Sequence, residues 1–236
     1  GNSSGSGTAQ SYTGSVNTDA GFSIIKYTGN GTDVMQVPHH LGVVPDAIFI
    51  KSLTTQSWNC FFPNALGADK GLQLDNTGAQ GGPFLSTHLS DDMPTTSVVK
   101  LGNGAATNTF ADGVGQDYIM YCWANKDGYL KVGTYTGNGS TDGTFIYTGF
   151  RPAYIMVKGS TIAEGWYIFD TKRDPYNDTE VSLRANTSAA EGTGATNDFL
   201  SNGFKIRHND TSWNSSGNTY IYIAFAESPF KYSNAR

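Results

Sequence analysis

The stretch KYTGNGT at residues 26–32 returns as TYTGNGS at residues 134–140. In both copies, side chains before the glycines alternate between two faces, as they do along a β-strand. The Gly-Asn-Gly sequence then supplies the positive φ angles that a tight hairpin turn requires. We therefore expect a strand followed by a hairpin turn at each of the two positions.

Five further blocks recur in the same order along the chain. The matching pairs are 45–51 with 152–158, 58–62 with 166–170, 76–77 with 186–187, 99–101 with 204–206, and 118–124 with 220–226. A constant order at offsets of about 102 to 110 positions indicates an internal duplication. The predicted organisation is a polar linker at 1–20, a β-sandwich repeat at 21–125 and a second repeat at 126–236. Because the sequence begins with Gly1 rather than an initiating methionine, we expect this chain to be the C-terminal part of a longer protein or a trimmed form.

The composition favours an all-β fold. The chain has 236 residues, of which 29 are glycine, 13% are aromatic and only 15% are charged. Glycine suits tight turns, and aromatic side chains suit a half-buried pleated surface. No stretch of 12 or more residues holds a helical period. We predict two homologous antiparallel β-sandwich repeats of jelly-roll or lectin-like type, with one pseudo-symmetric sandwich shared by both copies as the alternative.

Charge and hydropathy exclude two classes of partner. The formal net charge is −5 and the sequence pI is near 5.2, so no positive field favours a nucleic acid. The apolar runs, such as 220–226, are far shorter than the roughly 20 residues that cross a bilayer. We expect neither nucleic-acid binding nor membrane insertion.

Catalytic and metal-binding residue patterns are sparse. Glycan hydrolysis requires two carboxylates at a fixed separation, and Asp170 and Asp174 flank a segment with the composition of a turn. Asp174, Asn177 and Asp178 carry oxygen ligands suited to calcium, yet they lack a recognised loop spacing, so we interpret them as turn residues. We predict no catalytic residue, no metal and no cofactor.

Two aromatic residues in polar surroundings suggest sugar binding. Trp213 lies in the run HNDTSWNSS at 208–216, and Tyr176 lies in DPYND at 174–178. Exposed rings stack on sugar C–H groups while amides and carboxylates bind hydroxyls. We therefore predict a glycan-binding site formed by Trp213, Tyr176, Asn177, Asp174 and Asp178. The alternative is that these aromatics fold back onto the sandwich or contact a neighbouring subunit.

Motifs of the second copy resemble a tandem β-rich module found near the C-terminus of bacteriophage structural proteins. The matching segments are 135–140, 149–152, 169–170, 174–177, 198–205 and 219–230. The resemblance covers nearly all of the chain from Gly21 onward and transfers no catalytic residue. It implies a virion surface component such as a tail fibre, a head fibre or a capsid decoration protein, which assembles in the host cytoplasm as a homo-oligomer with other virion subunits.

The two cysteines agree with assembly in a reducing compartment. Cys60 and Cys122 correspond to Ile168 and Ala224 in the second copy. A position shared by cysteine and an aliphatic residue is expected in the core, where a thiol packs as a small hydrophobe. We predict two buried free thiols. The functional hypothesis is thus a non-enzymatic virion surface protein that contacts host glycan, and the alternatives are a glycan depolymerase or a free carbohydrate-binding module.

Overall fold

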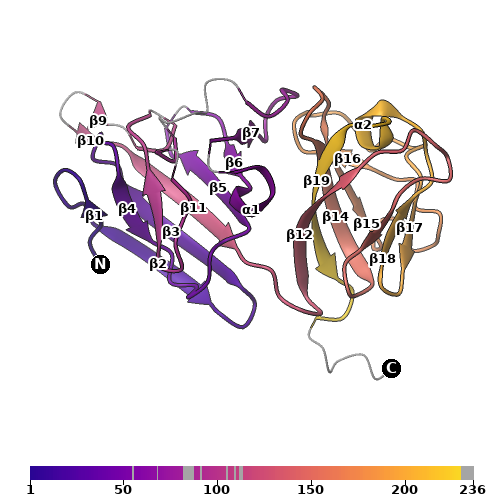
Figure 1. Ribbon diagram of the computed structural model, residues 1–236, viewed down its shortest axis with the longest axis horizontal. Coiled ribbons are helices and arrows are strands. Elements are labelled where there is room, and N and C mark those ends of the chain that lie inside the picture. Colours follow the sequence, from indigo (N-terminus) through magenta and orange to yellow (C-terminus); the bar gives the residue numbers. More distant parts are fainter. Residues whose placement is uncertain are drawn as a thin grey trace. The chain divides into compact units, whose positions relative to one another are not determined.

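The computed structural model is all-β, with 42% strand and 4% helix, which confirms the predicted fold class. It describes residues 1–229 except for 55, 68, 82–87, 91, 105, 109 and 112–113. The chain divides into two compact units (Figure 1). Unit 1 comprises Gly1–Leu74 and Gln80–Ala124, and unit 2 comprises Asp75–Ala79 and Asn125–Arg236.

Unit 1 contains a six-stranded sheet in the order β2-β3-β11-β5-β6-β7, a three-stranded sheet β1-β4-β8 and a two-stranded ribbon β10-β9. All of the pairings are antiparallel. The elements are β1 (Ser4–Gly5), β2 (Tyr12–Asn17), β3 (Phe22–Thr28), β4 (Met35–Pro38), β5 (Ala47–Ser52), β6 (Asn59–Phe61), α1 (Pro63–Leu66), β7 (Gly71–Gln73), β8 (Val98–Leu101), β9 (Phe110–Ala111), β10 (Val114–Gly115) and β11 (Asp117–Trp123).

Unit 2 contains a five-stranded sheet in the order β12-β19-β14-β15-β16 and a three-stranded sheet β13-β18-β17, again antiparallel. The elements are β12 (Leu130–Thr136), β13 (Phe145–Tyr147), β14 (Pro152–Gly159), β15 (Trp166–Asp170), β16 (Leu183–Arg184), β17 (Asn197–Leu200), β18 (Gly203–Ile206), α2 (Thr211–Asn214) and β19 (Thr219–Ala226).

The two units share a strand order. The run β3-β11-β5-β6-β7 of unit 1 corresponds to β12-β19-β14-β15-β16 of unit 2, and matched sequence blocks occupy matched strands. The shared order is what a duplication predicts, whereas the common origin of the repeats stays a prediction. Each unit also buries a separate core cluster, which one shared sandwich would not account for.

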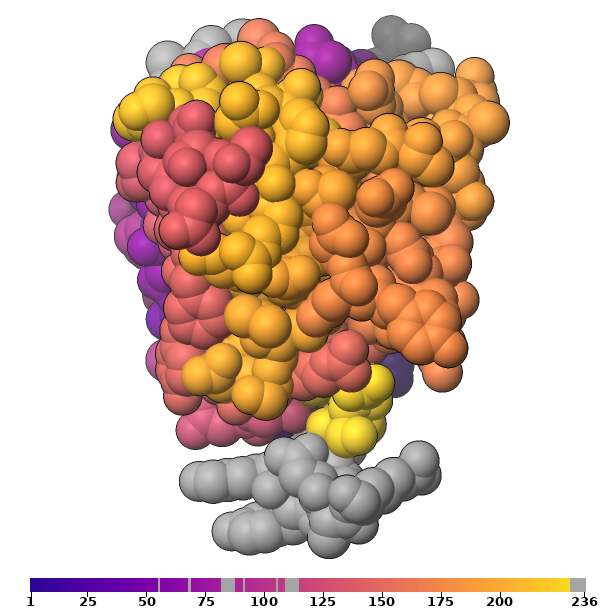
Figure 2. Space-filling view, turned by 90° about the vertical axis from the view of Figure 1, so that its right-hand side faces the viewer, coloured from indigo at the N-terminus to yellow at the C-terminus, as the bar shows by residue number. Residues whose placement is uncertain are grey.

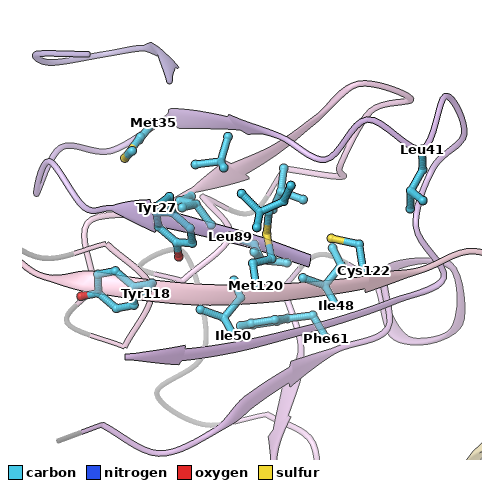
Figure 3. Packing of buried hydrophobic residues seen from close by; sticks show 14 of the residues in the cluster. Tyr27, Met35, Leu41, Ile48, Ile50, Phe61, Leu89, Tyr118, Met120 and Cys122 are labelled. Carbon is cyan, nitrogen blue, oxygen red and sulfur yellow. The ribbon is translucent and has the colours of Figure 1, made fainter. Parts of the chain in front are cut away.

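The core of unit 1 lies between its two large sheets (Figure 3). Alternate residues of β11 point inward, among them Tyr118, Met120 and Cys122. They meet Met35 and Val99 from the opposing strands β4 and β8. Burial of each large apolar side chain stabilises the fold by about 1.5–3 kcal/mol, so the alternation of strand residues produces a sandwich.

Both cysteines are buried free thiols, as predicted. Cys122 lies in the core of unit 1, where burial raises the pKa of its thiol to about 12. Because the thiolate is the reactive form, a thiol with so high a pKa is a poor nucleophile at neutral pH.

We expect the native chain to react with a disulfide reagent at least about a hundredfold more slowly than the unfolded chain. The reason is that Cys60 and Cys122 are both buried, whereas unfolding exposes both thiols. Absorbance of the released thiolate, followed with and without guanidinium, measures the two rates. Fast labelling of the native chain would contradict the buried positions.

The predicted hairpin turns are wrong, although the predicted positive φ is correct. Gly31 has φ 69° and Gly139 has φ 68°. The Asn-Gly loops nevertheless carry the chain from one sheet to the other, since β3 pairs with β2 and β11 whereas β4 pairs with β1 and β8. The same holds in unit 2, where β12 pairs with β19 and the next strand, β13, pairs with β18 in the opposing sheet.

The prediction of a polar linker at residues 1–20 is also wrong. Strand β1 pairs with β4, and β2 pairs with β3 from Tyr12 opposite Tyr27 to Asn17 opposite Phe22. Strand β2 is held by backbone pairing rather than by apolar burial, because most of its side chains are exposed. Gly14 also permits close approach, since a Cβ there would lie 2.4 Å from Ile25 Cδ1.

A buried asparagine holds the Asn-Gly loop of each unit. In unit 1, Asn108 Oδ1 accepts the backbone N–H groups of Asn30 at 2.7 Å and Gly31 at 3.1 Å. In unit 2, Asn214 Oδ1 accepts the backbone N–H of Asn138 at 3.0 Å. The Asn214 Nδ2 group donates to Ser140 O at 2.7 Å, to His208 O at 2.9 Å and to Asn138 Oδ1 at 3.0 Å. Each asparagine thus replaces the backbone partners that these loops lack.

A stacked tyrosine pair lies beside each of these loops. The rings of Tyr27 and Tyr118 are 5.2 Å apart in unit 1, and those of Tyr135 and Tyr220 are 5.1 Å apart in unit 2. The Tyr135 hydroxyl donates to Trp213 O at 2.7 Å. This hydrogen bond ties the core of unit 2 to the segment that contains Asn214.

Candidate functional site

A depression of about 490 Å³ in unit 2 brings aromatic and polar side chains together. Its floor comprises Tyr167 of β15 and Trp213 of α2, and residues 189–190 and 192–195 also line it. Arg184 and His208 also line it. Figure 2 shows part of the surface of unit 2, where the orange segment before residue 200 lies beside the yellow segment that follows it.

The aromatic floor is rigid because it belongs to the core. The rings of Tyr167 and Trp213 meet edge to face, with centroids 4.8 Å apart, and Phe169 packs against Trp213 at 6.1 Å. The Tyr167 hydroxyl donates to Ser212 Oγ at 3.1 Å. A floor fixed in this way presents the same surface to each ligand and loses little entropy on binding.

The polar part of the site carries one arginine, one histidine and one aspartate, Asp210, with Glu164 bound to the neighbouring helical turn. The Arg184 guanidinium carbon lies 5.0 Å from the Tyr167 ring centroid, which is a cation–π contact. The His208 ring is 5.7 Å from that of Trp213, and its Nδ1 accepts the Asp210 N–H at 3.0 Å. Glu164 is bound to the hydroxyl groups of Thr211 and Ser212, each at 3.1 Å.

The prediction that Trp213 is an exposed platform is wrong, because only 6% of its surface is exposed. The polar run around it forms the single helical turn α2, where Asp210 accepts the Ser212 N–H at 2.7 Å. The polar neighbours cap and brace this turn, so Trp213 packs inward against Tyr167. The alternative of an aromatic residue folded back onto the sandwich is the one observed.

The other predicted glycan-binding residues lie in a separate loop. Tyr176 is 81% exposed, and Asp178 is exposed too. Asn177 is bound to the backbone of Phe199, donating at 3.1 Å and accepting at 2.9 Å, and Asp174 accepts the Glu180 N–H at 2.7 Å.

Trp213 and the Tyr176 loop therefore do not form one binding site. No contact between them is found in the described part of the chain. Asp174 braces the loop itself, and Asn177 ties the loop to strand β17. Glycan binding by Tyr176 and Asp178 stays a prediction.

The carboxylates of Asp170 and Asp174, which were considered for glycan hydrolysis, stabilise turns. Asp170 accepts the backbone N–H groups of Lys172 and Arg173 at 3.0 and 2.8 Å and pairs with the Arg173 guanidinium at 2.6 Å. The same guanidinium pairs with Glu191 at 3.0 Å. Within the described residues, no group of three or more His, Cys, Asp or Glu side chains is placed to hold a metal ion.

Sequence reasoning missed Tyr167, Arg184 and His208. Tyr167 belongs to an apolar block, and the alternation of β15 gives no sign that its ring borders a depression. Arg184 lies in a segment with no motif, and His208, which begins the polar run 208–216 but was not assigned a role in it, follows 24 residues later in the chain. A second depression of about 320 Å³, lined by Lys131 and the 65%-exposed Tyr147, was missed for the same reason.

Comparison with known proteins gives one match. The family model described as a domain of unknown function, DUF7483, matches residues 1–229. No curated protein and no solved structure matched the chain. Among the described residues, no helix has both the length and the apolar character needed to cross a membrane.

Proposed function

We propose that this chain, which belongs to the DUF7483 family of domains of unknown function, is a non-enzymatic surface component of a bacteriophage particle that attaches to host glycan. The depression of unit 2, with its aromatic floor and polar rim, is the observation that carries the glycan-binding part. The sequence resemblance to phage structural modules supports the location on a virion. The family description adds no activity.

The depression has the chemistry of a sugar site. Its volume of about 490 Å³ lies within the roughly 300–1,000 Å³ range of small-molecule sites. Sugars present apolar C–H faces and polar hydroxyl edges, so they bind where aromatic rings and hydrogen-bonding groups meet. Tyr167 and Trp213 border the depression with only 4% and 6% of their surfaces exposed, and Arg184 and His208 supply the polar groups.

Binding without hydrolysis agrees with the roles of the acids. A glycosidase needs one carboxylate as acid and a second as base or nucleophile across the scissile bond. Asp170 is paired with Arg173, and Asp174 accepts backbone N–H groups, so each of the two carboxylates stabilises a turn. Because both carboxylates stabilise turns, their roles support binding of glycan rather than its hydrolysis.

Attachment through a small depression requires many copies. Single sugar sites bind weakly, whereas linked sites raise the effective concentration for each further contact. A homo-oligomer carried with other virion subunits on a particle would supply that multiplicity. We therefore propose that one particle presents many of these depressions to the host surface.

Filling the depression tests the proposal without truncating the core. Ala190 lines the depression and is exposed, so the indole of Ala190→Trp would occupy the space of a ligand. We expect tetramers of the chain on streptavidin to bind host cells and their purified surface polysaccharide, and Ala190→Trp to lower this binding at least tenfold. Cell binding and pull-down of the polysaccharide measure the effect.

Ser201→Trp is the matched control, because Ser201 is exposed in the turn between β17 and β18 and does not line the depression. Equal binding by both variants would reject the depression as the site. Loss of binding in Tyr176→Ala alone would place the site in the exposed loop instead. Release of reducing ends from the bound polysaccharide would contradict the non-enzymatic role. If mass spectrometry of purified particles did not detect the chain, the proposed location on the virion would be contradicted.

A further inference from the structure

We infer that the depression of unit 2 selects acidic sugars, whose carboxylate is bound by Arg184. This inference rests on the proposed function, since it names the class of glycan that the same depression would take. It depends on the pairing of arginines, on the hydrogen bonds of His208 and on the partners of the nearby acids.

Arg184 differs from the other arginines of the described residues. Three of them pair with a carboxylate: Arg151 with Glu227 at 3.1 Å, Arg173 with Asp170 at 2.6 Å and Arg207 with Asp198 at 2.6 Å. No ion pair or hydrogen bond of the Arg184 guanidinium is found in the described part of the chain; its contact is with the Tyr167 ring at 5.0 Å. The cation is therefore held at the depression while its N–H donors remain available to a ligand.

His208 adds a second donor to the same depression. Its Nδ1 accepts the backbone N–H of Asp210 at 3.0 Å. An N–H group cannot donate to a protonated ring nitrogen, so the neutral imidazole carries its proton on Nε2. The depression thus combines a guanidinium with an imidazole N–H donor, and both match a ligand rich in acceptor oxygens.

The acids around the depression already have donors of their own. Asp210 accepts the Ser212 N–H at 2.7 Å, and Glu164 accepts two hydroxyl groups. Glu191, next to the lining residue Gly192, pairs with Arg173 at 3.0 Å. Among the residues that line the depression, Arg184 carries the positive charge and Asp210 the negative one; the Asp210 carboxylate is bound by a backbone N–H, and Arg184 has no carboxylate partner in the described part of the chain.

The rest of the chain opposes unspecific binding of acidic polymers. With a net charge of −5, long-range attraction to a polyanion is absent. A preference for an acidic sugar would then come from a local contact. Arginine binds a carboxylate by two parallel hydrogen bonds, which a neutral hydroxymethyl group cannot accept in the same way.

The experiment compares sugars that differ only at the acidic group. Calorimetric titration would use trisaccharides of galacturonate, glucuronate and mannuronate, each beside the neutral trisaccharide of the same linkage and a sulfated form of that neutral sugar. We expect at least one carboxylated sugar to bind at least tenfold more tightly than its neutral and sulfated counterparts. Arg184→Gln should remove this preference, so that the acidic sugar and its neutral counterpart bind this variant with affinities within about twofold of each other.

Two further variants test whether the preference depends on the two parallel N–H donors of the Arg184 guanidinium. Arg184→Lys keeps the charge without the two parallel donors, so it should recover only part of the preference. Lys131→Gln removes the same charge at the second depression and should leave the preference unchanged. Loss of preference in Lys131→Gln, or its persistence in Arg184→Gln, would overturn the inference.

The inference and the proposed function fail in different ways. Equal affinity for acidic and neutral sugars defeats the role of Arg184 and leaves glycan binding intact. Tighter binding of the sulfated sugar defeats the carboxylate as the recognised group. Binding of none of the sugars, together with failure of the chain to bind host polysaccharide, defeats both.

Discussion

Replacement of Asn214 by alanine is expected to lower the free energy of unfolding of unit 2 by about 3–4 kcal/mol. The Asn214 side chain is fully buried and makes four hydrogen bonds, which reach Asn138, Ser140 and His208. Alanine leaves these buried partners without a substitute, and each unsatisfied group costs about 1–3 kcal/mol before relaxation. Domains have only about 5–15 kcal/mol of stability in total.

Chemical denaturation followed by near-ultraviolet circular dichroism measures the change. Asn209→Ala is the matched control, because Asn209 lies in the same segment and is exposed; we expect a change within about 0.5 kcal/mol. Asn108→Ala should destabilise unit 1 by a similar mechanism, since Asn108 binds the corresponding loop. A loss below about 1 kcal/mol in Asn214→Ala would show that the loop does not depend on this side chain.

Replacement of Trp213 by alanine is expected to cost about 3–5 kcal/mol, the range for large aromatic residues removed from a core. Trp213 packs against Tyr167 and Phe169, and its loss would leave a cavity between β15 and α2. The Trp213 Nε1 group has no hydrogen-bond partner in the described residues, so packing accounts for the cost. Trp213→Phe should therefore lose less than half as much.

Thermal and urea unfolding of the two variants checks this expectation. Tyr147→Ala is the control, because Tyr147 is 65% exposed and its truncation opens no cavity. Unchanged stability in Trp213→Ala would contradict the buried position. Because this variant is expected to disturb the whole depression, loss of glycan binding in Trp213→Ala would not identify a ligand contact, whereas Ala190→Trp and Arg184→Gln leave the core intact.

The strands were predictable because their side chains alternate or form short apolar runs. Residues 47–50 and 155–157 fall within β5 and β14, at the centres of their sheets. The strand β2 was not predictable in the same way, since its side chains are mostly exposed and its stability comes from backbone pairing. A composition rich in glycine and serine describes both a linker and such a strand.

The candidate site was less predictable than the fold. A polar environment along the chain suggested that Trp213 is exposed, but the helical turn α2 buries Trp213 together with the polar residues Ser212 and Asn214, whose side chains form hydrogen bonds inside the fold. Arg184 and His208 meet at the depression through folding of distant segments, so no local spacing reveals them. Tyr176, in contrast, is exposed as its proline-containing loop suggested.

The buried asparagines also affect how the chain ages chemically. Asn-Gly pairs in flexible peptides lose ammonia when the glycine nitrogen attacks the side-chain amide carbon of the asparagine. Here the Gly31 N–H is bound to Asn108 Oδ1 at 3.1 Å, and the Gly139 N–H is bound to Asn214 O at 2.8 Å. With the attacking nitrogens held in hydrogen bonds, the loops that join the two sheets of each unit resist deamidation for as long as the chain stays folded.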